Sequence, residues 1–504
     1  MSDVSRVSAV SRGSGVTGTA PGPLSRRRFF RLSALAVGGA FAAPSLFDAV
    51  ASAADGSSGS AAVGAFGSSS AAVCRADAAA DRIIASIRRP QIPRRDFPVG
   101  RYGAVADGVT DNTAAFAAAI GAASRGGGGR VVVPAGTYAT GPIHLLSRVE
   151  LHLEQGSVLL FSTDSNAYLP VVFTRWQGIE LMNYSPLIYA LDQHDIAITG
   201  QGVLDGQAST ANWWAWKPLE NADFALLSAQ ADAGVPVGQR VYGAGFHMPP
   251  TFVEPYRCER VLIQGVTFRN SPFWHLHPTL CKSVTVQGVT VNSTGPNTDG
   301  CDPECCDGVL IDHVTFDVGD DCIAVKSGRN SDGRRVNVPS RNIVIQNSSF
   351  ANGHGAVTIG SEMTGGVRDV YARDLSLTSA GLQSGHRLKT NSVRGGYIRN
   401  TNVYRVAASA VGGPVLLIDF NYGEGNTGTY PPLVTDISLA EWTVATCIQG
   451  WSAIGYQTDP IGTIKLSDVT ITAMTGANVA TYVTDFELSN VSINGTPVKS
   501  AVVS

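Results

Sequence analysis

The chain has 504 residues, which is enough for one large domain or for two to three ordinary ones. Its formal net charge of −3 gives no reason to expect nucleic acid as a partner. Eight cysteines are too few for a disulfide-dense scaffold, and 56 glycines with 15% charged residues suit a chain of many turns and short strands.

A basic cluster followed by an apolar run occupies the N-terminus. Residues 25–31, Ser-Arg-Arg-Arg-Phe-Phe-Arg, resemble the twin-arginine consensus, and residues 32–43 form the apolar run. Residues 51–53, Ala-Ser-Ala, then have the small side chains of a cleavage site. The apolar run is shorter than the ~20 residues of a membrane-spanning helix, so we predict a twin-arginine signal peptide over residues 1–53 rather than an anchor. The protein is then expected to be secreted, to the periplasm or beyond, and to keep no membrane contact after the signal is removed.

The chain after the signal divides into two predicted parts. The Ser/Gly/Ala-rich composition from about residue 55 predicts a flexible leader, placed at residues 54–90. Residues 91–504 are predicted to form a single catalytic domain. Early in this domain, residues 102–108 have the composition of a loop, and residues 113–120 predict an Ala-rich helix.

The second half of the chain contains an internal repeat. An eight-residue phrase, apolar-x-apolar-x-x-apolar-x-apolar, recurs there at intervals of 23, 25, 34 and 27 residues. Each copy alternates like a strand and places β-branched residues at apolar positions. The clear copies start at Val261, Val284, Val309, Ile343 and Val370, and weaker copies start at Val149, Ile196, Ile437, Ile464 and Phe486.

Strands that recur without helices between them predict an all-β solenoid, in this case a single-stranded parallel β-helix. No segment between the copies is long and helically periodic enough for a βαβ crossover. A β-sandwich or propeller would pair its strands antiparallel and would show tight hairpin signals such as Asn-Gly, so we favour the parallel β-helix. The helix at 113–120 would then cap the N-terminal end of the solenoid, where strand edges are otherwise unpaired.

Three cysteines keep step with the repeat. Cys258, Cys281 and Cys306 each lie three residues before the start of a copy. Stacked coils would place their side chains in a ladder of about 4.8 Å per step. Because twin-arginine export carries proteins that fold first in a reducing compartment, we expect several of the eight cysteines to be buried thiols.

Four loops between the central strands are rich in Asp, His, Gly and cations. Asp320 lies four residues after Phe316, and His354 lies four residues after the equivalent Phe350. Asp299 matches Asp320 if the loop before it bulges, which predicts that the side chains are stacked on successive coils. The four motifs are Asn297-Thr298-Asp299, Gly319-Asp320-Asp321, Gly353-His354-Gly355 and Arg387-Leu388-Lys389.

Each motif has an ordinary explanation when it is taken alone. Asp-Gly and Gly-Asp are common turn dipeptides, and a histidine between glycines can cap a turn. The combination is what indicates a site: three carboxylates, a histidine and two cations occupy equivalent positions of one solenoid.

The order of these motifs resembles the polygalacturonase family of glycoside hydrolases, family 28. Residues 102–138, 270–274 and 360–366 are also similar to its bacterial and plant-like members, so the resemblance covers roughly residues 95–425. The departure from the common pattern is Leu388, where isoleucine is usual. The resemblance implies a right-handed parallel β-helix that hydrolyses the α-1,4 bonds of homogalacturonan, the backbone of pectin, with inversion. No cofactor and no metal are expected, and we expect a monomer.

Carried over by motif, the resemblance gives the acidic residues and the histidine their roles. Asp320 would be the general acid. Asp299 and Asp321 would hold the attacking water, and His354 would tune the ionisation of the acid.

The same motifs imply a substrate-binding set. Arg387 and Lys389 would bind a substrate carboxylate, and Tyr422 would stack on a sugar ring. Asn297 joins them as the first residue of its motif. Lys326, which lies just past the second motif, would either add a cation to this pocket or serve the structure.

The chemistry of hydrolysis agrees with such a set of residues. An inverting glycosidase needs one protonated carboxyl at the leaving oxygen and a carboxylate holding water about 6.5–9.5 Å away. Three carboxyl groups within one or two coils repel one another as anions, which favours keeping one protonated. A polyanionic substrate also needs cations, and arginine can bind a carboxylate through two parallel hydrogen bonds.

Two rival functions keep the same fold. A pectate lyase would cleave by β-elimination, with calcium and an arginine base, and a non-catalytic β-helix would only bind polysaccharide. The three acids gathered with Arg-x-Lys favour hydrolysis over both. Residues 175–189 and the long insert at 213–248 resemble exo-acting bacterial relatives and would be able to close one end of the binding site, so we favour exo over endo cleavage.

Overall fold

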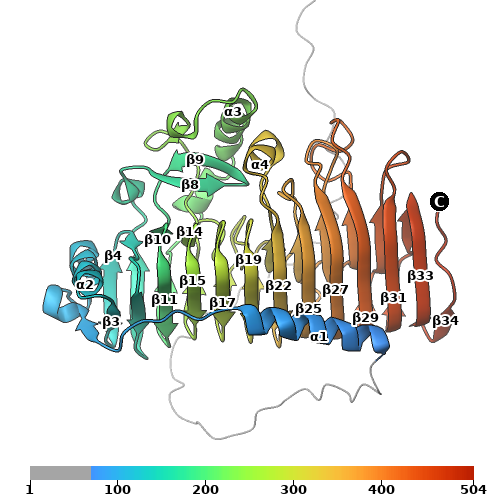
Figure 1. Cartoon of the computed structure of the whole chain (residues 1–504), viewed down its shortest axis with the longest axis horizontal. Helices are drawn as coiled ribbons and strands as arrows, with labels where there is room; N and C mark the ends of the chain where they lie inside the picture. The colour runs from blue at the N-terminus through green and yellow to red at the C-terminus, as the bar shows by residue number, and fades with distance from the viewer. Residues whose placement is uncertain (1–69) are drawn as a thin grey trace, which may run out of the picture. The chain divides into compact units, whose positions relative to one another are not determined.

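The computed structural model describes residues 70–504; the predicted signal peptide, residues 1–53, lies outside the described residues. The described chain winds into a right-handed parallel β-helix, which confirms the predicted fold class (Figure 1). Each coil contributes strands to three faces, and successive coils pair in parallel along each face. No helix within residues 70–504 is long and apolar enough to cross a membrane.

The first face is the longest ladder of strands. Each of its members pairs with the next one along the chain. They are β1 (Asp96–Pro98), β3 (Gly129–Val133), β6 (Val149–Leu153), β11 (His194–Gly200), β15 (Glu259–Gln264), β17 (Lys282–Gln287), β19 (Asp307–Asp312), β22 (Ser340–Gln346), β25 (Val367–Leu377), β27 (Tyr397–Ala408), β29 (Leu433–Cys447), β31 (Ile461–Met474) and β33 (Val483–Ile493).

The second and third faces complete the coils. The second face comprises β2 (Asp107–Asp111), β4 (Gly136–Thr140), β7 (Ser157–Phe161), β12 (Val203–Asp205), β16 (Thr267–Arg269), β18 (Thr290–Ser293), β20 (Thr315–Val318) and β23 (Ser349–Phe350). The third face comprises β5 (Ile143–His144), β10 (Ile188–Leu191), β14 (Val253–Tyr256), β21 (Ile323–Val325), β24 (Val357–Ile359), β26 (His386–Lys389), β28 (Pro414–Asp419), β30 (Gln449–Ile454) and β32 (Val479–Thr481).

The internal repeat predicted the register of the first face. Val261 pairs with Val284, which pairs with Val309. The ladder continues through Ile343 to Val370, so all five clear copies stack on one another. The apolar positions of these copies point inward, where they form one continuous core along the solenoid. The cysteine ladder follows the same register, and seven of the eight cysteines are buried thiols.

The predicted cap is also present. Helix α2 (Thr113–Arg125) lies at the N-terminal end of the solenoid (Figure 1). Its buried residues Phe116, Ala119 and Ile120 belong to the solenoid core. The helix therefore covers apolar side chains that the first coil would otherwise expose.

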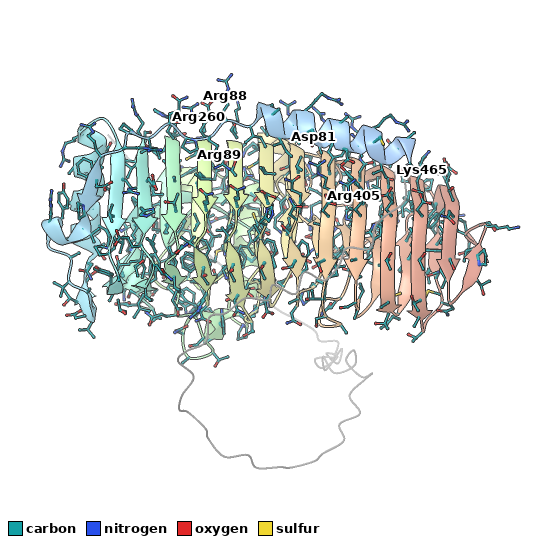
Figure 2. The ribbon with its side chains drawn as sticks, turned by 90° about the horizontal axis from the view of Figure 1, so that it is seen from below. Asp81, Arg88, Arg89, Arg260, Arg405 and Lys465 are labelled. Atoms are coloured by element: carbon teal, nitrogen blue, oxygen red, sulfur yellow. The ribbon has the colours of Figure 1, made fainter. Side chains whose placement is uncertain are left out.

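The prediction of a flexible leader is wrong for residues 71–86, which form helix α1 (Ala71–Ser86). This helix lies along the outer side of the first face (Figure 2). Its buried Val73, Ala76 and Ala80 pack against first-face side chains from β19, β22, β25, β27 and β29. Asp77 pairs with Arg373 and Arg405 at 2.8 Å each, which fixes the helix by charge as well. The Ala-rich composition concealed this 3–4 residue apolar spacing.

Two insertions interrupt the coils that precede the four motifs. The first is an antiparallel hairpin of β8 (Val172–Trp176) and β9 (Ile179–Asn183). The second lies between β12 and β14 and contains η3 (Trp213–Trp216), α3 (Glu220–Asp232), η4 (Val237–Gln239) and β13 (Val241–Tyr242). The remaining elements are η1 (Val99–Tyr102), η2 (Ser165–Tyr168), α4 (Asn330–Val336) and β34 (Thr496–Val498).

Candidate active site

The acidic motifs meet at one corner of the solenoid, where the chain turns from the second face to the third. Asp320 and Asp321 connect β20 to β21, and His354 connects β23 to β24 on the next coil. Asp299 lies at the same corner one coil earlier, just before Cys301, which pairs with Ile323. Parallel stacking therefore brings three successive turns together, as the repeat predicted.

The predicted alignment of Asp299 with Asp320 is wrong by one residue. Because Cys301 pairs with Ile323, the residue two positions earlier in each coil is Asp299 in one and Asp321 in the next. The backbone N–H of Gly300 donates to the carbonyl oxygen of Asp321 at 3.0 Å, which fixes this register. Asp320 instead corresponds to His354 of the following coil.

The three carboxyl groups form one cluster. One oxygen from each of Asp299, Asp320 and Asp321 lies within 4.8 Å of the others. The groups are thus closer than the 6.5–9.5 Å predicted from the usual spacing in inverting enzymes. Three carboxyl groups this close together resemble a cation-binding site, but the positive charge beside them belongs to protein side chains.

The carboxyl group of Asp321 accepts hydrogen bonds from three side chains. Its Oδ1 accepts hydrogen bonds from Thr358 and from Arg387, each at 3.1 Å. Its Oδ2 accepts from Nζ of Lys389 at 2.5 Å. The side chain is fully buried, so these donors replace the water that it has lost. The predicted carboxylate-binding pair, Arg387 and Lys389, therefore holds Asp321 when no substrate is bound.

Asp320 is the most accessible of the three carboxyl groups. Its side chain is 19% exposed, against 4% for Asp299 and 0% for Asp321. Burial acts to raise its pKa, but the hydrogen bond from Nδ1 of His354 (2.9 Å) and the charge of Lys389 outweigh this and lower it. The same contact raises the pKa of His354.

The environment of Asp299 favours the protonated form of its carboxyl group. Burial, with the nearby charge of Asp320, raises its pKa to about 8. Its Oδ1 is buried without a hydrogen-bond partner among the described residues, as suits a carboxyl group that carries a proton. That one of the three acids stays protonated remains a prediction, and the raised pKa favours Asp299 as that residue.

Lys326 is buried beside Asp299 and does not face the substrate. Its Nζ lies 3.7 Å from Asp299 Oδ2 and from Asp302 Oδ2, and 3.2 Å from Glu362 Oε2. The ring of Trp274 covers it at 4.2 Å. Its side chain is 3% exposed, which corrects the prediction that Lys326 binds substrate; of the two roles considered, the structural one fits.

Tyr422 lies beside the two cations of the fourth motif. Nζ of Lys389 is 5.1 Å from the centre of its ring, and the guanidinium carbon of Arg387 is 5.8 Å away. The structure therefore brings together the predicted aromatic platform and the predicted carboxylate-binding cations. An aromatic ring beside two cations suits a sugar acid, which has an apolar ring face and a carboxylate.

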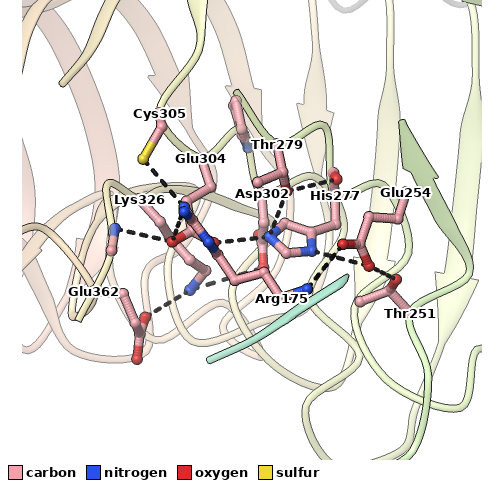
Figure 3. Close-up of polar contacts among 12 residues, drawn as sticks. Arg175, Thr251, Glu254, His277, Thr279, Asp302, Glu304, Cys305, Lys326 and Glu362 are labelled. Atoms are coloured by element: carbon pink, nitrogen blue, oxygen red, sulfur yellow. Dashed lines mark hydrogen bonds and ion pairs between the residues drawn. The ribbon is translucent and has the colours of Figure 1, made fainter. Parts of the chain in front are cut away.

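A buried ion network adjoins this cluster (Figure 3). Arg175 of β8 pairs with Glu304 at 3.1 Å, and His277 donates to Glu304 at 2.9 Å. Burial opposes a charge on His277, but the carboxylates of Glu254 and Glu304 raise its pKa to about 9. Glu304 pairs by backbone with Lys326 on the next coil, so the network connects the β8–β9 hairpin to the catalytic coils. Sequence reasoning missed this network because its members lie far apart in the chain.

The long insert reaches the first motif. Nζ of Lys217, which follows η3, donates to Oδ1 of Asn297. On the opposite edge of the third face, Arg329 lies over the ring of Phe224 in α3, 4.6 Å from its centre. The insert thus contacts the loops on both sides of the third face, next to the carboxylates. Lys217 has no motif around it, and its role is visible only in the folded chain.

Comparisons with known proteins agree with this geometry. The family model described as Glycosyl hydrolases family 28 matches residues 242–490, and one described as Rhamnogalacturonase A/epimerase, pectate lyase-like matches residues 97–152. A probable polygalacturonase of Vitis vinifera is 30% identical over 387 residues, which cover 73% of each chain. An exo-poly-alpha-D-galacturonosidase of Dickeya chrysanthemi is 28% identical over 376 residues, covering 69% of this chain and 60% of that protein.

Among solved structures, the hyperthermoactive exopolygalacturonase from Thermotoga maritima is similar with a TM-score of 0.80 and 39% identity. The match covers 84% of this chain and 96% of that one. The sequence match extends over most of the chain, and residues 242–490, which the family model matches, include the four motifs. The chain belongs to family 28 of the glycosyl hydrolases.

Proposed function

We propose that this protein hydrolyses the α-1,4 bonds of polygalacturonate. The observation that carries the proposal is the cluster of Asp299, Asp320 and Asp321, in which the pKa of Asp299 is raised, beside Arg387 and Lys389. A protonated carboxyl with neighbouring carboxylates supplies acid and base catalysis, and the two cations suit a polymer of sugar acids. The names of the relatives point to the same polymer.

Asp320 is proposed as the general acid, because it is the carboxyl group that a substrate can reach. In the free site the raised pKa of Asp299 favours a proton on that residue instead. A bound galacturonate adds negative charge and removes water, and both effects raise the pKa of Asp320. The proton then passes from Asp299 to Asp320 within the cluster, which leaves Asp299 as a carboxylate that can accept a proton from water.

Inversion is proposed in spite of the short spacing of the carboxyl groups. A retaining enzyme needs a carboxylate that bonds to the sugar carbon. Both oxygens of Asp321 are occupied by Thr358, Arg387 and Lys389, and the Asp299 side chain is 4% exposed. A water molecule is small enough to reach these groups where a sugar is not, so water is the proposed nucleophile.

Exo cleavage is proposed from the position of the insert. Its contacts with Asn297 on one side and Arg329 on the other place it across the third face, on the N-terminal side of the carboxylates. A polymer that passes along this face would meet the insert within a few sugar units. Only a chain end then fits between the insert and the acid.

Viscosity and reducing ends measured together test this mode of cleavage. We expect monomer or dimer of galacturonate to dominate the first products, with viscosity falling more slowly than reducing ends appear. Mixed oligogalacturonates in the first minutes, with viscosity halved at a few per cent hydrolysis, would establish endo cleavage. That outcome would overturn the proposal for the insert and leave the catalytic residues in place.

The twin-arginine route is proposed for export, from the motif at residues 25–31, which lies outside the described residues. Changing Arg26 and Arg27 together to lysine is expected to keep the protein in the cytoplasm, because the pair is the feature that the transporter reads. Cell fractionation with activity assays measures this. Unchanged export of the double variant would indicate another route.

A further inference from the structure

The insert is built onto the loop of the first motif rather than resting loosely above it. The indole N–H of Trp214 in η3 donates to the carbonyl oxygen of Ser271 at 3.0 Å. Its ring lies so close to Gly295 that a Cβ atom there would come 2.1 Å from the ring. A residue larger than glycine at 295 would therefore push the insert away. Gly295 precedes Asn297 by two residues, so this contact fixes the insert beside the motif.

Lys217 extends from this anchored turn to Asn297. Its Nζ donates to Oδ1 of Asn297 and pairs with Oε1 of Glu220 at 2.5 Å. Glu220 is buried, and burial raises the pKa of its carboxyl while the charge of Lys217 opposes that rise. The Lys217 side chain is 41% exposed, so one side of the ammonium remains open to solvent.

The hydrogen bond from Lys217 turns the amide oxygen of Asn297 toward the ammonium and the NH₂ group away from it. An ammonium can only donate, so it selects the amide oxygen. The NH₂ group of Asn297 has two N–H donors, and neither bonds to another residue in 70–504. Its nitrogen is not among the buried atoms that lack a partner. Without a neighbour that distinguishes them, the oxygen and nitrogen of an asparagine amide can exchange places by rotation of the side chain.

We propose that Lys217 is a positioning residue that holds the Asn297 amide with its NH₂ donors toward the substrate, so that the insert forms part of the sugar-binding site. The inference rests on the proposed function, because galacturonate offers only carboxylate and ring oxygens and hydroxyl groups near such donors. The carboxylate and the ring oxygen accept but do not donate. Two fixed N–H groups therefore favour galacturonate, and a reversed amide would repel its carboxylate.

The substitution Lys217→Met tests this, because methionine keeps an unbranched stem and removes the donors. With trigalacturonate as substrate, KM is expected to rise about 10-fold or more, as for the loss of a charge-assisted contact, while kcat stays within about threefold. Lys217→Arg is expected to keep the KM of the wild type, because the arginine side chain, like that of lysine, donates hydrogen bonds and accepts none. The matched control is Lys465→Met, because Lys465 forms an exposed pair with Glu487 on the first face, away from the motifs.

A double-mutant cycle separates positioning from general stability. Asn297→Ala should raise KM as Lys217→Met does, and the double variant should be no worse than Asn297→Ala alone. Additive effects, or a Lys217→Met variant with the KM of the wild type, would overturn the inference. If Lys217→Met melts at a lower temperature than the wild type, Lys217→Leu, which also removes the donors, takes its place in the cycle. If the wild type itself does not cleave trigalacturonate or polygalacturonate, the proposed function fails instead.

Discussion

The variant Asp320→Asn is expected to lose turnover on polygalacturonate by at least about 10²–10⁴-fold, the usual contribution of a general acid. Asparagine has nearly the shape of aspartate, but it cannot deliver a proton to the leaving oxygen. Because Asp320 is the most exposed acid of the cluster, no other carboxyl group can take its place at the bond. Initial rates of reducing-end release measure the loss, and thermal melting checks that the variant is folded.

The matched control for this variant is Asp317→Asn. Asp317 lies three residues earlier on β20, and its carboxylate accepts hydrogen bonds from Asn292 and Asn352 at the surface. Its loss should leave most of the turnover. If Asp320→Asn retained more than a tenth of the wild-type turnover, Asp320 would not be the acid, and Asp299, whose pKa is raised, would be the candidate.

The largest effect on stability is expected for Arg175→Met. The Arg175 guanidinium is fully buried and pairs with Glu304 at 3.1 Å and with Glu180 at 3.4 Å. Methionine fills part of the space but removes the cation between the two buried carboxylates, so Glu304 keeps only His277 and Glu180 keeps only Arg335 as a charged partner. Breaking a buried ion pair by removing one partner costs roughly 3–5 kcal/mol. Chemical denaturation should show this loss in the free energy of unfolding.

Arg257→Met is the control for Arg175→Met. Both guanidinium groups lie over the ring of Tyr256, that of Arg175 at 5.8 Å and that of Arg257 at 5.4 Å from its centre. The partner of Arg257, Asp192, is 57% exposed. Exposed ion pairs are worth about 0–1 kcal/mol, so this variant should unfold almost as the wild type does. Equal losses from the two variants would show that the stacking on Tyr256, and not the buried charge, is what matters.

The fold was predictable because its cause is local and repeated. An apolar pattern such as that of residues 261–268 describes one strand, and its recurrence at similar spacing leaves a stacked solenoid as the simplest structure. The register followed from the same copies, as the pairing of Val261, Val284 and Val309 confirms. Helix α1 was missed because a single short helix has no repeat, and its packing partners lie more than 200 residues further along the chain.

The candidate site was predictable only in part. Its acids and cations lie in short motifs on successive coils, so the solenoid register placed them together. The exact alignment of Asp299 depended on where its loop rejoins the third face, and the sequence of that loop does not determine this. Residues such as Lys217 and Arg175 belong to inserts, whose packing depends on tertiary contacts rather than on the repeat.

The acid cluster is proposed to hydrolyse polygalacturonate with water as the nucleophile. Proton NMR of the digestion, recorded from the first minutes, tests it most directly, because one spectrum reports product size, saturation and anomeric form. We expect saturated galacturonate or its dimer, appearing first as the β-anomer, because inversion of an α-bond gives the β-anomer. Early α-anomer would contradict water as the nucleophile and indicate a covalent intermediate. Unsaturated products, or no cleavage by the folded protein, would contradict hydrolysis itself.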